Sequence, residues 1–215
     1  TVGGGTMVLP ILQSRRPNSH HMRVETVING TLNFVFSEIE RGRTLSEACS
    51  EALALGYAEP GATDEVSLIN GELADIVMKT CVLFNTTLSR KKSLSPFFAK
   101  GFKLSLDDIE NLSDVAADYR FVVTFSNTTG SMGEYLGARF ETEQDGWRIA
   151  GGFRRISRSS AFDWVPNGVS NALHIVEGDR LGKGGSYTVS GPGAGIEPTT
   201  TAMLNDFERL MTVKL

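Results

Sequence analysis

The sequence predicts an α+β fold in which a mixed, largely antiparallel β-sheet carries helices packed on one face. Two observations support this prediction. Helical patterns dominate the first part of the chain, extended patterns follow from about residue 120, and one further helical pattern closes it. The pair Asp145-Gly146 lies between two of the extended segments, and such a pair is typical of the tight turn that joins antiparallel strands.

The first part of the chain predicts four helices and one strand. Gly3 to Gly5 lack the spacing of a nucleotide-binding loop, so we interpret them as a turn before the first helix. Gly42 is expected to end the second helix. Thr44 and Glu47 form a T-x-x-E capping box, which predicts the start of the third. The helices are expected at about residues 7–15, 32–41, 45–54 and 66–86, and the strand at about 24–28.

The second part predicts one short helix, five strands and a closing helix. Ser105 precedes the segment LDDIENLS and is a suitable N-cap for the short helix. The strands are expected at about residues 120–127, 134–142, 147–156, 172–178 and 186–191, and the closing helix at about 200–212.

Composition limits the classes of function. The chain has 215 residues, of which 40% are hydrophobic, and a formal net charge of -4. A mildly acidic chain matches poorly with nucleic acid or an anionic membrane surface, because both select a basic face. The sequence contains no apolar run of the roughly 18 residues that a membrane span needs. Cys49 and Cys81 lie in apolar helical patterns without C-x-x-C spacing, which indicates reduced thiols and a cytoplasmic protein.

The helix expected at about 66–86 carries an unusual pair of charges. Nine of the twelve residues from Leu73 to Phe84 are apolar, which predicts a helix buried on nearly all sides. Asp75 and Lys79 are four residues apart and therefore lie on one face. Burying a charge costs several kcal/mol unless it is paired, so the pair is either a structural ion pair or part of an active site.

Further carboxylates precede this helix. Glu59 follows the third helix, and Asp64 and Glu65 stand where the long helix begins, so the latter two are suitable capping groups. Together with Lys79, the acids also suit a small substrate that carries an ammonium group and a carbonyl, because the lysine can exchange a proton with the oxygen. The sequence shows no recognisable motif that pairs a nucleophilic Ser or Cys with a His base, which disfavours acyl transfer.

Several segments resemble the catalytic domain of homoserine dehydrogenases. The family pattern N-G-T-x-N, a helix and then G-[YF]-[AT]-E is similar to VINGTLNFVFSEIERGRTLSEACSEALALGYAEP. DIVMK resembles the family's D-x-A-x-K helix, and SGPGAGIEPTTTAMLNDF resembles its closing G-x-GAG segment. The opening TVGGGT resembles the junction at which the family's chain leaves its nucleotide-binding domain. The resemblance covers essentially the whole chain.

This resemblance implies a dehydrogenase that reversibly reduces L-aspartate 4-semialdehyde to L-homoserine, a step of threonine and methionine biosynthesis. By position, Lys79 would be the acid/base lysine that protonates the aldehyde oxygen. Asp75 would hold Lys79 and bind the substrate, and Glu59 would bind the substrate near its amino end. Four further residues would line the same pocket: Tyr57, Thr31, Asp64 and Glu65.

The resemblance also implies cofactors. NADP or NAD would bind with the backbone of Gly193 and Gly195 close to the nicotinamide, since close approach needs residues without a Cβ. A monovalent cation such as Na⁺ would bind backbone carbonyls of the junction, here those of Val2, Gly4 and Thr6.

The resemblance further implies a domain organisation and an assembly. Residues 1–10 would be the junction from an upstream dinucleotide-binding domain, 11–195 the substrate and dimerisation domain, and 196–215 a helix that returns to pack on the upstream domain. The chain starts at a Thr, so we expect a part of a longer polypeptide that transfers no hydride by itself. Members of the family pair their sheets across a two-fold axis, which implies a homodimer.

Two departures keep other functions open. Glu59 and Asp75 are further apart than is usual in the family, and Val77 replaces the Ala of D-x-A-x-K. One alternative is a diverged dimerising or ligand-binding module without dehydrogenase activity. Another is a dehydrogenase for a different semialdehyde.

Overall fold

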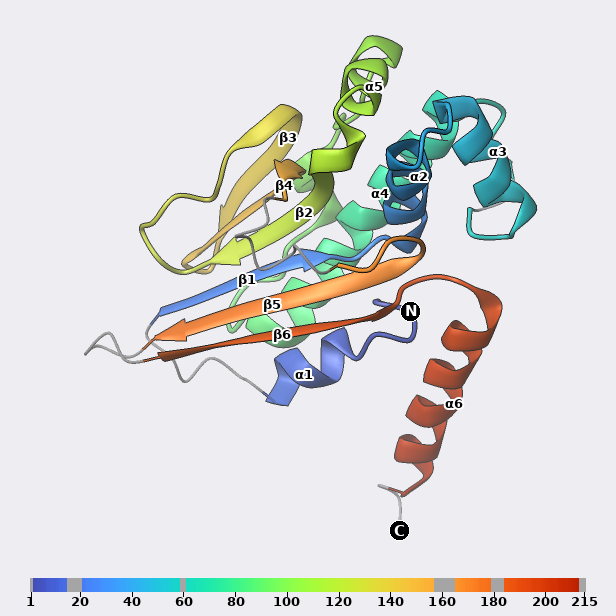
Figure 1. Ribbon diagram of the computed structural model, residues 1–215. Coiled ribbons are helices and arrows are strands. Elements are labelled where there is room, and N and C mark those ends of the chain that lie inside the picture. Colours follow the sequence, from blue (N-terminus) through green and yellow to red (C-terminus); the bar gives the residue numbers. More distant parts are fainter. Residues whose placement is uncertain (1, 15–20, 59–60, 157–164, 179–183, 213–215) are drawn as a thin grey trace.

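The structure is a computed structural model that describes residues 2–14, 21–58, 61–156, 165–178 and 184–212. Its described strands form one six-stranded sheet in the order β3-β4-β2-β1-β5-β6 (Figure 1). Each of the five pairings between described strands is antiparallel. This confirms the predicted α+β class with a largely antiparallel sheet, and the described strands include no parallel pair. The strands are β1 (His21–Val27), β2 (Tyr119–Ser126), β3 (Tyr135–Gln144), β4 (Trp147–Arg155), β5 (Ser170–Gly178) and β6 (Gly184–Pro192).

The turn between β3 and β4 confirms the predicted hairpin. Asp145 and Gly146 both have positive φ, at 55° and 80°, as the two central residues of a type I′ turn require. The Asp145 carboxylate also accepts the backbone N–H groups of Arg90 and Lys91, at 2.8 and 2.7 Å. These two bonds hold the pKa of Asp145 below its usual value and tie the hairpin tip to the loop that follows the long helix.

The helices lie close to their predicted positions. Thr44 and Glu47 form the predicted capping box, and Ser105 caps its helix as expected. The last helix begins before its predicted start, because Pro198 is tolerated in a first turn, where the missing N–H costs nothing. The helices are α1 (Val8–Ser14), α2 (Gly30–Glu40), α3 (Leu45–Ala54), α4 (Glu65–Leu83), α5 (Leu106–Ser113) and α6 (Ile196–Thr212). Three short elements were not predicted, namely a π-helical turn at Phe84–Leu88 and 3₁₀ segments at Pro96–Ala99 and Ala116–Asp118.

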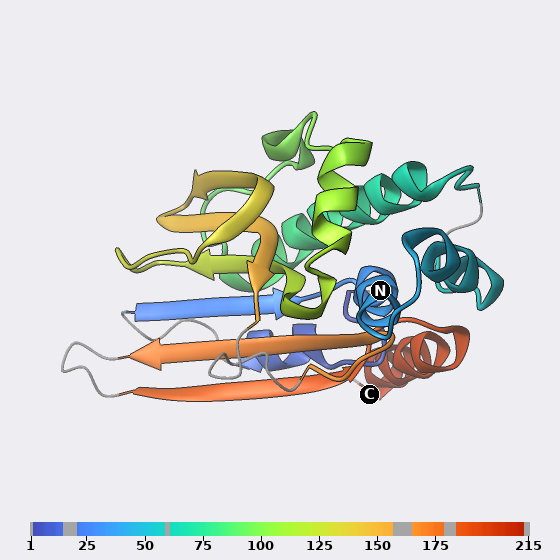
Figure 2. The ribbon, with the colours of Figure 1, turned by 45° about the horizontal axis from the view of Figure 1, so that its top comes forward.

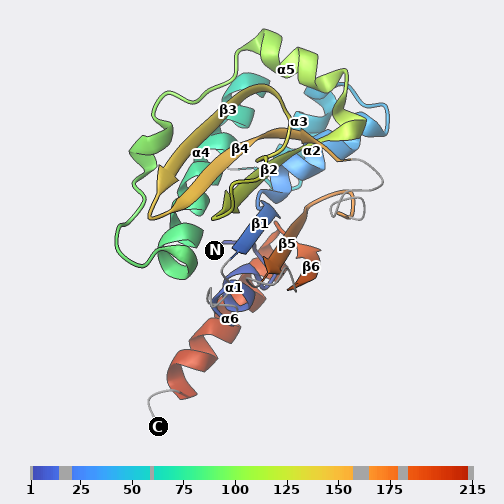
Figure 3. The same ribbon diagram turned by 90° about the vertical axis from the view of Figure 1, so that its left-hand side faces the viewer.

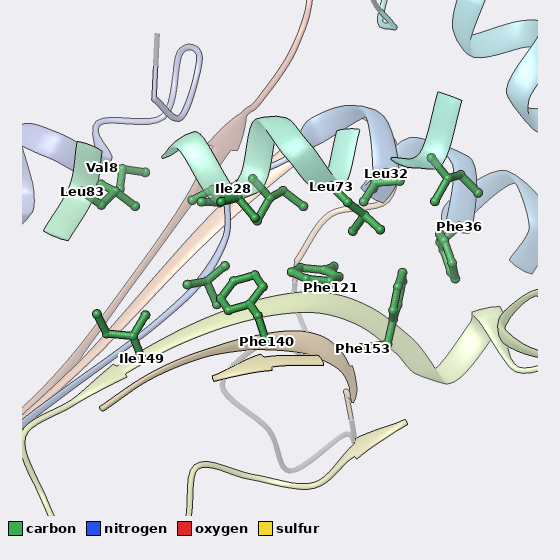
Figure 4. Close-up of a cluster of buried hydrophobic side chains, with 14 of the residues drawn as sticks. Val8, Ile28, Leu32, Phe36, Leu73, Leu83, Phe121, Phe140, Ile149 and Phe153 are labelled. Carbon is green, nitrogen blue, oxygen red and sulfur yellow. The ribbon is translucent and has the colours of Figure 1, made fainter. Parts of the chain in front are cut away.

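One large core lies between the sheet and the helices. The buried apolar side chains of the helices from α1 to α5 belong to this core, together with alternate residues of the strands. Phe121 of β2 and Phe153 of β4 meet edge to face with ring centroids 5.2 Å apart, and Phe36 of α2 packs on Phe153 at 4.9 Å (Figure 4). A small cluster on the opposite sheet face joins Val27, Val122 and Ala172, which all belong to strands.

The expectation that α4 is buried on nearly all sides is wrong. Met78 and Val82 are 52% and 39% exposed, although Leu73, Ile76 and Leu83 are fully buried. The physical reason is that α4 lies on one face of the sheet, so its outer side turns away from the core (Figure 3).

Helix α6 has no buried residue among those described. It projects away from the sheet in two views at right angles (Figures 1 and 3). Its apolar side chains are therefore outside the core, which is unusual for an amphipathic helix of 17 residues.

Candidate active site

A cavity of about 620 Å³ opens where α2, α4 and the connection from β6 to α6 meet. The connection lies beside the start of α2 (Figure 2), and a Cβ on Gly30 would come within 2.9 Å of the Gly193 carbonyl carbon. The polar face of α4 forms the opposite wall. The lining includes Asn29, Gly30, Thr31, Tyr57, Ser67, Glu72, Asp75, Lys79, Gly193, Ala194 and Gly195.

Asp75 and Lys79 form an ion pair within this cavity. Lys79 Nζ lies 2.5 Å from Asp75 Oδ2, and both residues line the cavity, which confirms that they share one helix face. The side chain of Lys79 is 19% exposed and that of Asp75 is 42% exposed. The pair is therefore partly shielded and still accessible to a ligand. Exposed helix pairs of this spacing contribute only about 0.3–0.5 kcal/mol to stability, so folding alone gives little reason for the pair.

Two polar residues of the cavity were missed by the sequence analysis as site residues. Asn29 donates from Nδ2 to Glu72 Oε2 at 2.7 Å and to Asp75 Oδ2 at 3.1 Å. Glu72 is three residues before Asp75, so Glu72, Asp75 and Lys79 form one stripe along α4. That spacing was readable in the sequence, whereas the approach of Asn29 depends on the tertiary structure.

The predicted site residues Thr31 and Tyr57 come together at the cavity. Thr31 Oγ1 donates to the backbone carbonyl of Tyr57 at 2.7 Å, which ties the first turn of α2 to the segment after α3. The Tyr57 ring packs edge-on against Phe34, with centroids 5.0 Å apart. Both residues line the cavity together with Lys79.

The predicted acids of the preceding segment lie elsewhere. Asp64 is the N-cap of α4 and accepts the Ser67 backbone N–H at 2.7 Å, which holds the pKa of Asp64 below its usual value. A hydrogen bond with the Ser46 side chain lowers the pKa of Glu65. Neither acid is among the cavity-lining residues, so the structure supports the capping interpretation. Glu59 lies outside the described residues.

The glycine-rich connection could accommodate a closely approaching cofactor. Gly193 and Gly195 line the cavity, and Gly195 has a φ of 108°, which favours glycine. A Cβ on Gly193 would lie 2.4 Å from Asn171 Oδ1, so no larger residue fits there without rearrangement. Of the three residues from Gly193 to Gly195, which all line the cavity, only Ala194 carries a side chain, a single methyl group, so a ligand can approach the backbone of this connection.

The residues expected to bind a cation line a different cavity. Val2, Gly4 and Thr6 border a hollow of about 400 Å³ between the first residues and α6. The Thr6 carbonyl accepts the Val8 N–H at 2.7 Å. Among the described residues no three His, Cys, Asp or Glu side chains group as metal ligands, and the carboxylates that line this hollow are those of Glu197 and Asp206.

Comparison with known proteins decides the family. A family model described as Homoserine dehydrogenase matches residues 8–207. The chain belongs to the homoserine dehydrogenase family. The sequence motifs that surround Asn29, Tyr57, Lys79 and Gly195 therefore reflect true membership, and the predicted resemblance is confirmed.

Among curated relatives, an NAD(+)-dependent homoserine dehydrogenase of Pseudomonas canavaninivorans is 32% identical over 208 residues, which cover 96% of this chain and 52% of the relative. A homoserine dehydrogenase of Pseudomonas aeruginosa is 31% identical over 210 residues, which cover 95% of this chain and 42% of the relative. The chain thus spans about half the length of the homoserine dehydrogenases that it matches.

Solved structures of the family share the fold. A hyperthermophilic archaeal homoserine dehydrogenase in complex with NADPH has a TM-score of 0.62 and 21% identity, covering 100% of this chain and 54% of that one. The homoserine dehydrogenase of Thermoplasma acidophilum has a TM-score of 0.62 and 19% identity, covering 100% of this chain and 56% of that one.

In the described part of this chain, no helix is both long and apolar enough to cross a membrane.

Proposed function

We propose that the full-length protein is an NAD(P)-dependent homoserine dehydrogenase that interconverts L-aspartate 4-semialdehyde and L-homoserine. The observation that carries this proposal is the Asp75–Lys79 pair, which lines one cavity with the Gly193–Gly195 connection. A proton donor and a glycine-rich backbone segment then flank the same space. The names of the relatives support the same reaction, including one that uses NAD(+).

In the proposed reaction, the chain's residues manage the proton and the orientation of the substrate. Bound NADPH or NADH supplies the hydride that reaches the aldehyde carbon. Lys79 donates a proton from Nζ to the aldehyde oxygen, which becomes the hydroxyl of homoserine, and accepts it in the reverse direction. Asp75 holds Nζ at 2.5 Å and keeps the lysine directed into the cavity.

The same cavity offers groups for the substrate's other end. The charged residues among the described lining are Glu72, Asp75 and Lys79, so the lining has a net charge of -1. A negative lining suits the ammonium group of an amino-acid substrate. Thr31 and Tyr57 border this region, and Glu59 remains a proposed ligand of the amino end. Asp64 and Glu65 contribute to the site only by stabilising the start of α4.

Other elements of the proposal concern the complete protein. A monovalent cation such as Na⁺ would bind the carbonyls of Val2, Gly4 and Thr6, and residues 196–215 would pack on an upstream nucleotide-binding domain. The enzyme would act in the cytoplasm, in threonine and methionine biosynthesis. We also propose a homodimer that pairs the sheet faces opposite the main core, because the buried apolar side chains of the helices from α1 to α5 belong to that core and not to the opposite face. Sedimentation of the full-length protein as a monomer would contradict the dimer.

The deciding experiment is an assay of the full-length protein for L-homoserine-dependent reduction of NAD⁺ and NADP⁺. Turnover of L-homoserine is the expected result. A protein that binds the cofactor but turns over no homoserine would favour the diverged binding module, which the long Glu59–Asp75 spacing keeps open. Preferential turnover of another hydroxy compound would favour a different semialdehyde as the substrate.

A further inference from the structure

Asn29 occupies a buried position between β1 and α2, with 3% of its surface exposed. Its Oδ1 accepts the backbone N–H of Leu32 at 2.7 Å and thereby caps α2. Its Nδ2 donates to Glu72 at 2.7 Å and to Asp75 at 3.1 Å. Both polar atoms of the amide therefore have partners, and these partners lie on two different helices.

These partners determine which way the amide points. The Leu32 N–H needs an oxygen acceptor, and the two carboxylates need N–H donors, so a flipped amide would lose all three bonds. Asn29 is therefore held in the orientation that donates to Asp75. Glu72, which is 8% exposed, holds the amide from the buried side.

Asp75 Oδ2 accepts hydrogen bonds from donors on two different elements. It receives Lys79 Nζ at 2.5 Å from its own helix and Asn29 Nδ2 at 3.1 Å from the start of α2. The Asp75 side chain is 42% exposed, so packing alone does not hold it in place. The position of Lys79 Nζ thus depends on Asp75, and that of Asp75 depends on Asn29.

We propose that Asn29 is a positioning residue of the active site, which acts through Asp75 to hold Lys79 Nζ against the reacting oxygen. This inference rests on the proposed function. A displacement of about 1 Å in a reacting group can cost on the order of 100-fold in rate. A neutral amide performs this role without adding a charge, and it keeps two carboxylates close together on the same wall of the cavity.

The first test is Asn29→Ser in the full-length protein. Serine is about as good an N-cap as asparagine, so α2 stays capped, but its side chain is too short to reach Asp75. We expect kcat with L-homoserine to fall by about 10- to 100-fold, with a smaller change in KM. The melting temperature should fall moderately, because buried Glu72 also loses the donor, so kcat is measured well below it. Asn29→Asp is the second variant. It keeps an oxygen for the Leu32 N–H but replaces the donor, and should lose at least as much kcat.

A double-mutant cycle separates positioning from a merely structural role. If Asn29 acts through Lys79, Asn29→Ser causes no further loss of kcat in a Lys79→Ala background. Asn70→Ser is the matched control, because Asn70 binds both backbone groups of Leu104, at 3.0 and 2.9 Å, and is not among the cavity-lining residues. Its kcat should stay within about two-fold of wild type, since surface or remote changes seldom alter chemistry.

Each outcome has a distinct meaning. Equal losses from Asn29→Ser in the wild-type and Lys79→Ala backgrounds would overturn the positioning role and leave the proposed function intact. A wild-type kcat in Asn29→Ser would do the same. A wild-type full-length protein without any homoserine turnover would overturn the proposed function, and this inference with it.

Discussion

Lys79 is the side chain on which the proposed proton transfer depends. In the full-length protein, Lys79→Ala is expected to lower kcat by about 10²- to 10⁴-fold, because a general acid normally contributes that factor. The measurement is the initial rate of NAD(P)⁺ reduction with saturating L-homoserine. The control is Lys103→Ala, which removes an exposed lysine outside the cavity. A Lys79→Ala rate within a few-fold of wild type would contradict the assigned role.

Glu25 of β1 is the centre of a separate charge network on the open sheet face. Arg23 donates to it at 2.6 Å, and Arg154 of β4 also pairs with it. Burial by itself raises the pKa of Glu25, but the hydrogen bonds and charges of Arg154 and Arg23 outweigh it, so the pKa lies below its ordinary 4.5. The network therefore joins two strands through a carboxylate that stays ionised at neutral pH.

This lowered pKa predicts a pH dependence of stability. A carboxylate with a depressed folded-state pKa contributes stability above its unfolded value of 4.5, and that contribution is lost as the pH falls through the folded pKa. Glu25→Gln should lower the free energy of unfolding by about 1.5–3 kcal/mol near neutral pH, since it removes the charge from the acceptor of two arginines. The loss should shrink below about pH 4.

Urea denaturation of the two proteins across this pH range is the measurement. Glu141→Gln on strand β3 is a suitable control, because Glu141 is 41% exposed and its contact with Arg148 is 3.5 Å long. Exposed pairs contribute only about 0–1 kcal/mol, so this control should change little. An equal loss in the Glu25 and Glu141 variants would count against the buried network.

At the scale of single elements, α4 has two functions in one helix. One side contributes Leu73, Ile76 and Leu83 to the core, and the stripe of Glu72, Asp75 and Lys79 faces the cavity. The sequence predicted the helix and the shared face of Asp75 and Lys79. It overestimated burial, because an apolar composition does not reveal that only one side of a helix meets the sheet.

The start of α4 tests the two interpretations of Asp64. The capping interpretation predicts that Asp64→Ala lowers the melting temperature, whereas Asp64→Asn keeps it near that of wild type, because Asn accepts the Ser67 N–H equally well. KM for L-homoserine should be unchanged in Asp64→Asn. Thermal denaturation and steady-state kinetics of the full-length variants provide both readouts. A raised KM with normal stability in Asp64→Asn would instead indicate that Asp64 binds the substrate.

At the scale of the whole molecule, α6 exposes apolar side chains that would be suited to contact with another domain or chain. Its outer residues Met203, Leu204, Phe207, Leu210 and Met211 are between 56% and 69% exposed. Exposed apolar groups of this density are typical of surfaces that another domain or chain covers. This property supports the proposal that residues 196–215 pack on an upstream domain.

Hydrogen exchange can test this packing. Backbone amides from Met203 to Met211 should exchange more slowly in the full-length protein than in a chain of residues 1–215, because local opening is rarer where a helix is covered. Phe207→Ser in the full-length protein should restore faster exchange along the helix. The amides of α5, whose Ile109 and Leu112 already lie in the core, provide the internal reference. Equal exchange of α6 in both proteins would refute the packing.

Local sequence patterns predicted the six α-helices, the six strands, the hairpin at Asp145-Gly146 and the shared helix face of Asp75 and Lys79. These features follow from periodicity, capping and turn chemistry, which act between residues a few positions apart. Two contacts of the site come from the tertiary fold instead: Asn29 reaches Asp75 across 46 positions, and Gly193 closes the cavity beside Gly30. Such contacts depend on how β1 comes to lie between β2 and β5, and no local pattern encodes that arrangement.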